Sequence, residues 1–315
     1  MKQIIVSGAA GFIGSEFCRM LQDTDTVIHM IDPLVTGSDT LRAIPASRRH
    51  IRYFGQTLYN ACEAIDLETI DTVFMFGALS SVDYCNDNPG HAFYYNVSDV
   101  FNFLQLLHFM KHEGLKVPKL VYVSTDEVGG QLDYDGKPWH PEGQPETVTS
   151  QPIPHNPRNT YSGSKAAAEM LVKGMCTQYG IEFVITRAVN NYGHNQGGGK
   201  LIPNIIDAVN SGTPIPIRGN SVEDVNTHYR CWVAVEDHCK AVLDASTKPS
   251  GYIYHVPGQK LKNIQVIKMV SRQLGKPFKL GLKPAREAHD MGYQLKGDKS
   301  FEARFTLGTY FKGNK

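Results

Sequence analysis

The sequence lacks an excess of charge of either sign. Its 315 residues carry 32 lysines and arginines against 31 aspartates and glutamates, which gives a net charge of +1 with histidine neutral. Proteins that bind nucleic acid or anionic membranes present a concentrated basic surface, and this balance indicates none. We therefore expect neither nucleic acid nor a membrane surface among the partners of this protein.

Long hydrophobic runs are also missing. No apolar stretch reaches the ~20 residues that a membrane-spanning helix requires. The chain enters a strand-like pattern at once, with Ile4-Ile5-Val6, so we expect no signal peptide before the first strand.

Cysteine pairs with the spacing of metal ligands are absent as well. No two of the six cysteines form a CxxC pair, and all lie inside apolar segments, at positions 18, 62, 85, 176, 231 and 239. We interpret them as reduced, buried thiols. This cysteine usage predicts a cytoplasmic protein, and we expect no metal site.

The sequence does contain a regular alternation of short apolar runs with helical stretches, which is typical of a doubly wound α/β fold. The first strand is followed by a glycine-rich turn and a helix through about Leu21. Further strands are predicted at residues 27–31, 72–76, 120–124 and 183–186. The continuous apolarity of residues 72–76 suits a strand covered on both faces. We therefore predict a Rossmann-type parallel sheet with a smaller C-terminal lobe.

The character of the sequence changes twice along the chain. Residues 131–157 are polar and hold six prolines, at 138, 141, 145, 152, 154 and 157, which predicts a surface loop or lid. After Arg187, glycines and prolines punctuate short elements. We place the Rossmann domain at residues 1–187, with residues 225–250 returning to it, and the second lobe at residues 188–315.

A glycine pattern lies between the first strand and the first helix. Gly8, Gly11 and Gly14 form GxxGxxG, and Asp32 ends the second strand eighteen residues after Gly14. Such glycines permit a tight turn and a close approach of the backbone to a pyrophosphate, which the helix N-terminus attracts. A carboxylate at Asp32 can accept both ribose hydroxyls and would repel a 2′-phosphate. The pattern predicts a dinucleotide site that prefers NAD to NADP.

Two groups of residues suggest acid/base chemistry. Tyr161 and Lys165 are four residues apart at the start of a predicted helix, so they share one helix face. An ammonium beside a phenol favours the phenolate, and we expect it to lower the pKa of Tyr161. Thr125-Asp126-Glu127 follows a strand, on the side where open α/β sheets bind ligands. The two carboxyls offer a second acid/base pair, which simple alcohol oxidation does not require.

Together these motifs resemble the extended short-chain dehydrogenase/reductase family, and most closely its dTDP-glucose 4,6-dehydratase branch. The resemblance covers roughly residues 1 to 290. It rests on motifs that recur in order: GAAGFIG at 8–14, STDEV at 124–128, YSGSK at 161–165, NNYG at 190–193, KLIP at 200–203 and RCWVAVEDH at 230–238.

The resemblance implies an NAD-dependent enzyme that converts a nucleotide-diphosphate hexose into a 4-keto-6-deoxy sugar. Thr125 would polarise O4 while Tyr161, supported by Lys165, removes its proton during oxidation at C4. Glu127 would then take the C5 proton and Asp126 would protonate the departing C6 hydroxyl. One carboxyl must therefore be ionised and the other protonated, which two like charges in one cleft favour.

The resemblance also implies the residues of the two binding sites. For NAD they are Gly8, Gly11, Phe12, Ile13, Gly14, Asp32, Thr57, Leu58, Ala78, Tyr161 and Lys165. For the nucleotide sugar, in the lobe at 188–315 and at the end of one sheet strand, they are Ser80, Asn191, Lys200, Leu201, Arg230, Arg286 and His289. Family members are usually homodimers that pack the helix after Asn96 and the helix carrying Tyr161 into a four-helix bundle.

Several departures from the branch pattern keep other functions open. Thr57-Leu58 replaces the usual Asp-Ile beside adenine, and Leu79-Ser80-Ser81 replaces a Glu-Ser-His sequence near the sugar. The alternatives are a 4-epimerase, a 5,6-dehydratase that stops at an unsaturated sugar, and a non-catalytic dinucleotide sensor. Asp126 and Glu127 argue against an epimerase, and the retained Tyr161 argues against a sensor. Neither the base nor the C2 substituent of the sugar follows from the sequence.

Overall fold

The computed structural model describes residues 1–35, 50–130, 155–285, 292, 295 and 297–310. These residues separate into two compact units. The first unit holds residues 1–128, 159–187 and 239–254, and the second holds residues 129–158, 188–238 and 255–315. The expected lid at 131–157 lies outside the described residues except for its last three positions.

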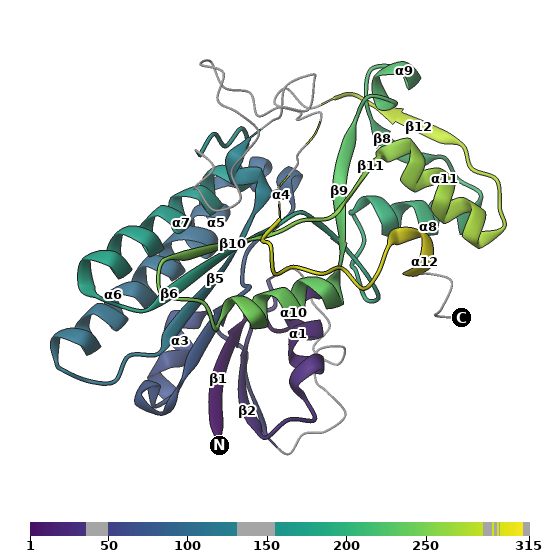
Figure 1. Ribbon diagram of the computed structural model, residues 1–315. Coiled ribbons are helices and arrows are strands. Elements are labelled where there is room, and N and C mark those ends of the chain that lie inside the picture. Colours follow the sequence, from purple (N-terminus) through teal and green to yellow (C-terminus); the bar gives the residue numbers. More distant parts are fainter. Residues whose placement is uncertain (36–49, 131–154, 286–291, 293–294, 296, 311–315) are drawn as a thin grey trace. The chain divides into compact units, whose positions relative to one another are not determined.

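A seven-stranded sheet forms the centre of the first unit, in the order β10-β6-β5-β4-β1-β2-β3 (Figure 1). The pairs β1–β2, β2–β3, β1–β4 and β4–β5 are parallel. The strands are β1 (Lys2–Ser7), β2 (Thr26–Ile31), β3 (Ile51–Phe54), β4 (Thr72–Met75), β5 (Lys119–Thr125), β6 (Phe183–Ala188) and β10 (Tyr252–Val256). From β1 the chain moves outward through β2 and β3, then returns to β4 on the other side of β1. The strand order therefore reverses between β1 and β4, the position at which such sheets bind ligands.

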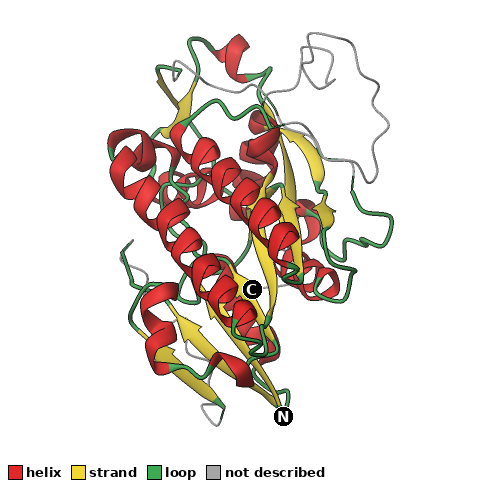
Figure 2. Ribbon diagram, turned by 90° about the vertical axis from the view of Figure 1, so that its left-hand side faces the viewer, coloured by secondary structure: helices red, strands yellow, loops and turns green. Residues whose placement is uncertain are grey.

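Helices cover the sheet because parallel strands need crossover connections. Figure 2 shows long helices lying across one face of the strands, and α6 packs against α7. The helices are α1 (Phe12–Leu21), α3 (Leu58–Ala61), α4 (Val82–Asp87), α5 (Pro89–Phe93), α6 (Asp99–His112), α7 (Thr160–Tyr179) and α10 (Val235–Ala245). Short helical turns are η1 (Cys62–Ala64), η2 (Leu67–Thr69), η3 (Tyr94–Ser98) and η4 (Asp126–Gly129). The η3 turn has π geometry and joins α5 to α6 without a break, and such π-bulges often occur at functional sites.

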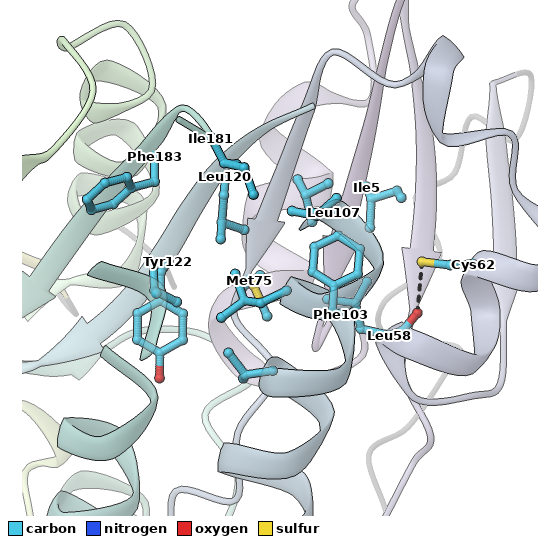
Figure 3. Close-up of a cluster of buried hydrophobic side chains, with 14 of the residues drawn as sticks. Ile5, Leu58, Cys62, Met75, Phe103, Leu107, Leu120, Tyr122, Ile181 and Phe183 are labelled. Carbon is cyan, nitrogen blue, oxygen red and sulfur yellow. Dashed lines mark hydrogen bonds between the residues drawn. The ribbon is translucent and has the colours of Figure 1, made fainter. Parts of the chain in front are cut away.

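The core of the first unit lies between the sheet and these helices. Figure 3 shows Ile5 of β1, Met75 of β4 and Leu120 of β5 in one cluster with Phe103 and Leu107 of α6. Each of these side chains is at most 3% exposed. Burying one large apolar side chain contributes roughly 1.5–3 kcal/mol, so this cluster fixes the strands whose carboxyl ends carry the candidate site.

The second unit is built from two small sheets, ordered β11-β9-β7 and β12-β8. Strand β9 pairs antiparallel with β11 and parallel with β7. Its strands are β7 (Asn190–Tyr192), β8 (Ile215–Arg218), β9 (Tyr229–Ala234), β11 (Gln259–Lys262) and β12 (Leu280–Lys283). Its helices are α8 (Leu201–Ser211), α9 (Val222–Val225), α11 (Asn263–Leu274) and α12 (Leu307–Tyr310). Helices α8 and α11 pack together over an apolar core that includes Ile205, Trp232 and Ile267.

The predicted Rossmann-type α/β fold is confirmed. All five strands expected in residues 1–187 are present, and the first helix ends at Leu21 as expected. Every residue of β4 is buried, in agreement with a strand covered on both faces. All six cysteines are buried thiols. Within the described part of the chain, no helix is both long enough and apolar enough to cross a membrane.

Candidate active site

The turn after β1 brings three backbone segments into close contact. Gly8 adopts a φ of +70°, and a Cβ placed on it would lie 2.5 Å from the backbone nitrogen of Gly77 at the end of β4. A Cβ on Gly14 would lie 2.2 Å from the carbonyl oxygen of Gly8. Gly11 is the N-cap of α1, so the first amides of this helix face the turn. Neither Gly8 nor Gly14 has room for a side chain, because backbone atoms of the turn and of the segment after β4 lie against both positions.

Asp32 is attached to this turn by its carboxylate. One carboxylate oxygen accepts a hydrogen bond from the Ala10 amide at 3.0 Å, and the other accepts one from the Leu34 amide at 2.8 Å. Burial raises the pKa of Asp32, while hydrogen bonds from Leu34, Ala10 and Gly11 oppose that rise. The carboxylate of Asp32, which is predicted to bind the ribose of the cofactor, is therefore held at a fixed position beside the glycine turn.

The remaining cofactor candidates differ in how they are placed. Phe12 and Ile13, in the first turn of α1, and Ala78, after β4, are half-buried. Leu58 instead points into the core and is 2% exposed, and its amide donates to the Asp99 carboxylate at 3.2 Å. Thr57 caps α3. Both the side chain and the amide of Leu58 are thus in contact with other parts of the protein, and its cofactor role stays a prediction.

Four candidate catalytic side chains gather where β5 ends and α7 begins. Thr125 and Tyr161 are hydrogen-bonded through their side chains, and the Thr125 hydroxyl donates to Asp126 Oδ1 at 3.2 Å. Because this hydroxyl has a single proton, it can donate to the carboxylate or to the phenol oxygen, but not to both. The negative charges of Glu127 and Asp126 both act on Tyr161. The structure thus brings together a phenol, a hydroxyl and two carboxyls.

The expected lowering of the Tyr161 pKa is wrong for the protein alone. Tyr161 is only 9% exposed, and burial, followed by the charges of Glu127 and Asp126, raises its pKa above the usual value. Lys165 does share the helix α7 with Tyr161, but its ammonium donates to the Val123 carbonyl at 2.8 Å. Burial also lowers the pKa of Lys165 to about 7, so near neutrality it supplies less positive charge than the sequence suggests.

Two asparagines belong to this region although the sequence analysis assigned them no role. Asn96, in the π turn, hydrogen-bonds both the amide and the carbonyl of Leu79, at 2.7 and 3.1 Å, and donates to Ser164 of α7 at 2.9 Å. It fixes the segment that carries Ser80, whose side chain is exposed. Asn159 caps α7 and also donates to Glu127 at 3.4 Å. Asn159 and Ser162 are three positions apart, the spacing of a reciprocal helix cap. This spacing is a helix-start signal that could have identified the cap from the sequence.

The second unit holds the other substrate candidates. Asn191 Oδ1 lies 2.9 Å from Nδ1 of His238, and its amide nitrogen donates to the Val189 carbonyl at 3.0 Å. Burial lowers the pKa of His238 to about 4, so a neutral imidazole that donates from Nδ1 fits this pair.

The basic candidates of this unit are more open to solvent. Lys200 is exposed at the N-cap of α8, and Leu201 begins that helix half-buried. Arg230, also half-buried, donates to the Tyr229 carbonyl at 2.7 Å. Arg286 and His289 lie outside the described residues. Among the residues that are described, no three His, Cys, Asp or Glu side chains gather as metal ligands would.

These features define a dinucleotide-binding enzyme scaffold of the short-chain dehydrogenase/reductase type. Residues 4–256 match the model of the NAD dependent epimerase/dehydratase family, and the chain belongs to that family.

Relatives and solved structures agree with this assignment. The dTDP-glucose 4,6-dehydratase of Neisseria meningitidis serogroup B is 29% identical over 283 residues, which cover 86% of this chain and 75% of the relative. The structure of DesIV, a dTDP-glucose 4,6-dehydratase from Streptomyces venezuelae, was solved with NAD bound. It matches with a TM-score of 0.84 and 26% identity over 98% of this chain and 96% of that chain. A UDP-glucose 4-epimerase from Thermus thermophilus, also in complex with NAD, has a TM-score of 0.82 at 23% identity, over 99% of this chain and 100% of its own; this likeness shows the fold alone.

The family is NAD-dependent, and the residues of the first unit fit this cofactor. The glycine turn at residues 8–14, which we call the cofactor cradle, leaves no room for a Cβ on Gly8 or Gly14, as the tight turn and close helix packing of a dinucleotide-binding turn require. Asp32 presents a carboxylate beside the same turn, which suits a ribose diol and disfavours a 2′-phosphate.

Proposed function

We propose that this protein is an NAD-dependent nucleotide-diphosphate hexose 4,6-dehydratase whose product is a 4-keto-6-deoxy sugar nucleotide. The observation that carries the proposal is the grouping of Tyr161 and Thr125 with two carboxyls, Asp126 and Glu127, beside a dinucleotide cradle. An enzyme that only oxidises and reduces C4 needs the first two residues. The second pair is not required for that chemistry, and it suits a reaction in which a C–H bond and a C–O bond are broken as well.

In the first half of the reaction Tyr161 takes the proton of the C4 hydroxyl, and Thr125 polarises O4 through a hydrogen bond. Bound at the glycine turn and Asp32, NAD would supply the acceptor for the C4 hydride and its donor to C6, and its positive charge would favour the phenolate form of Tyr161. The buried site around Tyr161 excludes water, which strengthens these interactions. Lys165 holds the α7 helix against β5 through Val123 and contributes charge when protonated.

The second half of the reaction uses the two carboxyls. The ketone formed at C4 acidifies the C5 hydrogen, and Glu127 in its ionised form takes that proton. Asp126 in its protonated form gives its proton to the C6 hydroxyl, which leaves as water. Adjacent carboxyls in one site disfavour double ionisation, so the pair supplies one acid and one base at the same pH. A proton returns to C5 as the C6 hydride is delivered.

We also propose that Asn191, Lys200 and Arg230 bind the diphosphate of the substrate, with Ser80 and Leu201 near the sugar nucleotide. Lysine and arginine suit phosphate through charge and, for arginine, through paired hydrogen bonds. The names of the relatives, which act on dTDP-glucose, support a nucleotide-diphosphate hexose as the substrate class.

We also propose that the protein is a homodimer and that it works in the cytoplasm. Phe93, Phe109 and Met170 are 61%, 58% and 50% exposed on α5, α6 and α7, and α6 packs beside α7. A second copy that packs these helices into a four-helix bundle would cover them. Replacing Phe109 and Met170 with glutamate should then give a monomer in analytical ultracentrifugation. The six buried thiols suit a reducing compartment.

The activity is tested by incubating the NAD-loaded protein with a panel of nucleotide-diphosphate hexoses and following the loss of one water by mass spectrometry. We expect dehydration of at least one sugar nucleotide. Glu127→Gln and Asp126→Asn should still reduce bound NAD but release almost no dehydrated product. An epimerase would instead return a sugar of unchanged mass, and both carboxyl variants would retain nearly full activity.

A further inference from the structure

Asn159 both caps helix α7 and donates a hydrogen bond to Glu127. Its side-chain oxygen accepts a hydrogen bond from the Ser162 amide at 2.8 Å, and its backbone amide donates to the Ser162 hydroxyl at 3.2 Å. This reciprocal cap begins the helix that carries Tyr161. The amide nitrogen of the same side chain donates to Glu127 Oε2 at 3.4 Å. One residue therefore connects the start of α7 to the carboxyl at the end of β5.

Asparagine can make both interactions at once because its side chain has an acceptor and a donor on separate atoms. Serine and threonine cap helices as well, but their single hydroxyl oxygen would have to serve both the helix amide and the carboxylate. Aspartate caps equally well and has nearly the same shape, but it would place a second negative charge against Glu127. Asparagine at position 159 can therefore cap the helix and also donate a hydrogen bond to an ionised Glu127.

The two carboxyls of the site consequently have different partners. Asp126 is 6% exposed and accepts from Thr125, whereas Glu127 is half-buried and accepts from the Asn159 amide. A hydrogen-bond donor favours the ionised form of the carboxyl that it contacts. Thr125 can turn its single proton to the phenol of Tyr161 instead, whereas the Asn159 amide always donates. The carboxyl that must act as the base is thus contacted by a donor that cannot turn away.

We infer that Asn159 is a positioning residue that orients Glu127 and keeps it ionised for removal of the C5 proton, while holding the first turn of the Tyr161 helix. This inference rests on the proposed dehydratase reaction. It predicts that the two halves of that reaction respond differently, because Asn159 contacts Glu127 directly and should act on elimination more than on oxidation at C4.

The test compares Asn159→Asp, Asn159→Ser and Asn159→Ala with the wild-type protein loaded with NAD. The aspartate and serine variants keep a capping side chain, and their melting temperatures should stay near that of the wild type. The alanine variant loses the cap and should melt at a lower temperature. Single-turnover mixing with the sugar nucleotide follows NADH absorbance, and solvent deuterium incorporated at C5 reports proton removal.

We expect the aspartate variant to form NADH still and to accumulate it, because elimination should slow more than oxidation at C4. Its C5 exchange and product release should slow by about 10- to 100-fold, as the loss of a hydrogen bond to a charged group implies. The serine variant should show a smaller defect of the same kind. If elimination slows only in the alanine variant, together with its lower melting temperature, Asn159 is a cap alone and the inference fails. If all steps slow equally in the aspartate variant, the inference also fails. A wild-type protein that dehydrates no sugar nucleotide would overturn the proposed function and this inference together.

Discussion

Replacing Gly14 with alanine is a stringent test of the cofactor cradle. An added Cβ would lie 2.2 Å from the carbonyl oxygen of Gly8, 2.9 Å from its carbonyl carbon and 3.1 Å from the Cα of Ala9. All three neighbours are backbone atoms of the turn itself, so the clash cannot be relieved by moving the end of a flexible side chain. Helix α1 or the turn must shift, and the amides that face the pyrophosphate shift with it.

The cost of such overpacking is typically about 1–3 kcal/mol. We expect part of it to appear as a lower free energy of unfolding, and part as NAD affinity weakened by roughly 10- to 100-fold. Calorimetric titration of the NAD-free protein measures the affinity, and urea denaturation measures the stability.

Gly174→Ala is the matched control for this substitution. Gly174 is exposed inside α7, and a Cβ there meets nothing within 4 Å. Alanine at this position should raise the free energy of unfolding by about 0.5–1 kcal/mol, since glycine is costly inside a helix, and should leave NAD affinity unchanged. A Gly14→Ala protein with wild-type affinity and stability would refute the close-approach argument.

Three further predictions concern the residues around Tyr161. Tyr161→Phe removes the proposed base and should slow NAD reduction by substrate by roughly 10²–10⁴-fold, with an unchanged circular dichroism spectrum; full activity would exclude the base role. Glu169→Gln leaves the guanidinium of Arg187, which is fully buried against Glu169, without its counter-charge. It should cost about 3–5 kcal/mol in urea denaturation, and a loss under 1 kcal/mol would contradict this account. Because the pKa of Lys165 is lowered from its ordinary value of 10.5 to about 7 when folded, the unfolded chain binds more protons between about pH 7 and pH 10.5, and stability should rise with pH there. Lys165→Met should flatten that rise, and an unchanged slope would disprove the lowered pKa.

Most of the first unit follows from local sequence patterns. The segments that became β1, β2, β4, β5 and β6 contain short apolar runs, and α1 follows the glycine-rich turn after β1, so each was predicted from its local pattern. Strand β3 (Ile51–Phe54) was not predicted, because its four residues alternate weakly and only pairing with β2 defines it. The candidate catalytic residues could be located because they cluster within short motifs at strand and helix ends.

Properties that arise from packing could not be read from the sequence. The pKa of Tyr161 is raised because the phenol is buried in a cluster with Leu79, Cys85 and Ala92 and lies near two carboxyls, a result of tertiary structure and not of the Tyr-Lys spacing. Leu58 matches a cofactor position in the sequence, but the structure turns its side chain into the core and its amide toward Asp99. Asn96 and Asn159 act through residues 17 and 32 positions away, and nothing in their local sequence indicates those partners.

The fate of the hydrogen at C4 tests the central claim most directly. A nucleotide-diphosphate hexose with deuterium at C4 is converted by the wild-type protein, and the product is examined by nuclear magnetic resonance. If the protein is a 4,6-dehydratase, the deuterium leaves C4 during oxidation and returns to C6, so the product carries a labelled methyl group on C5 and a ketone at C4. Deuterium found at C4 of the product would contradict the account. An intact C6 hydroxyl would then indicate an epimerase, and a double bond between C5 and C6 would indicate a 5,6-dehydratase.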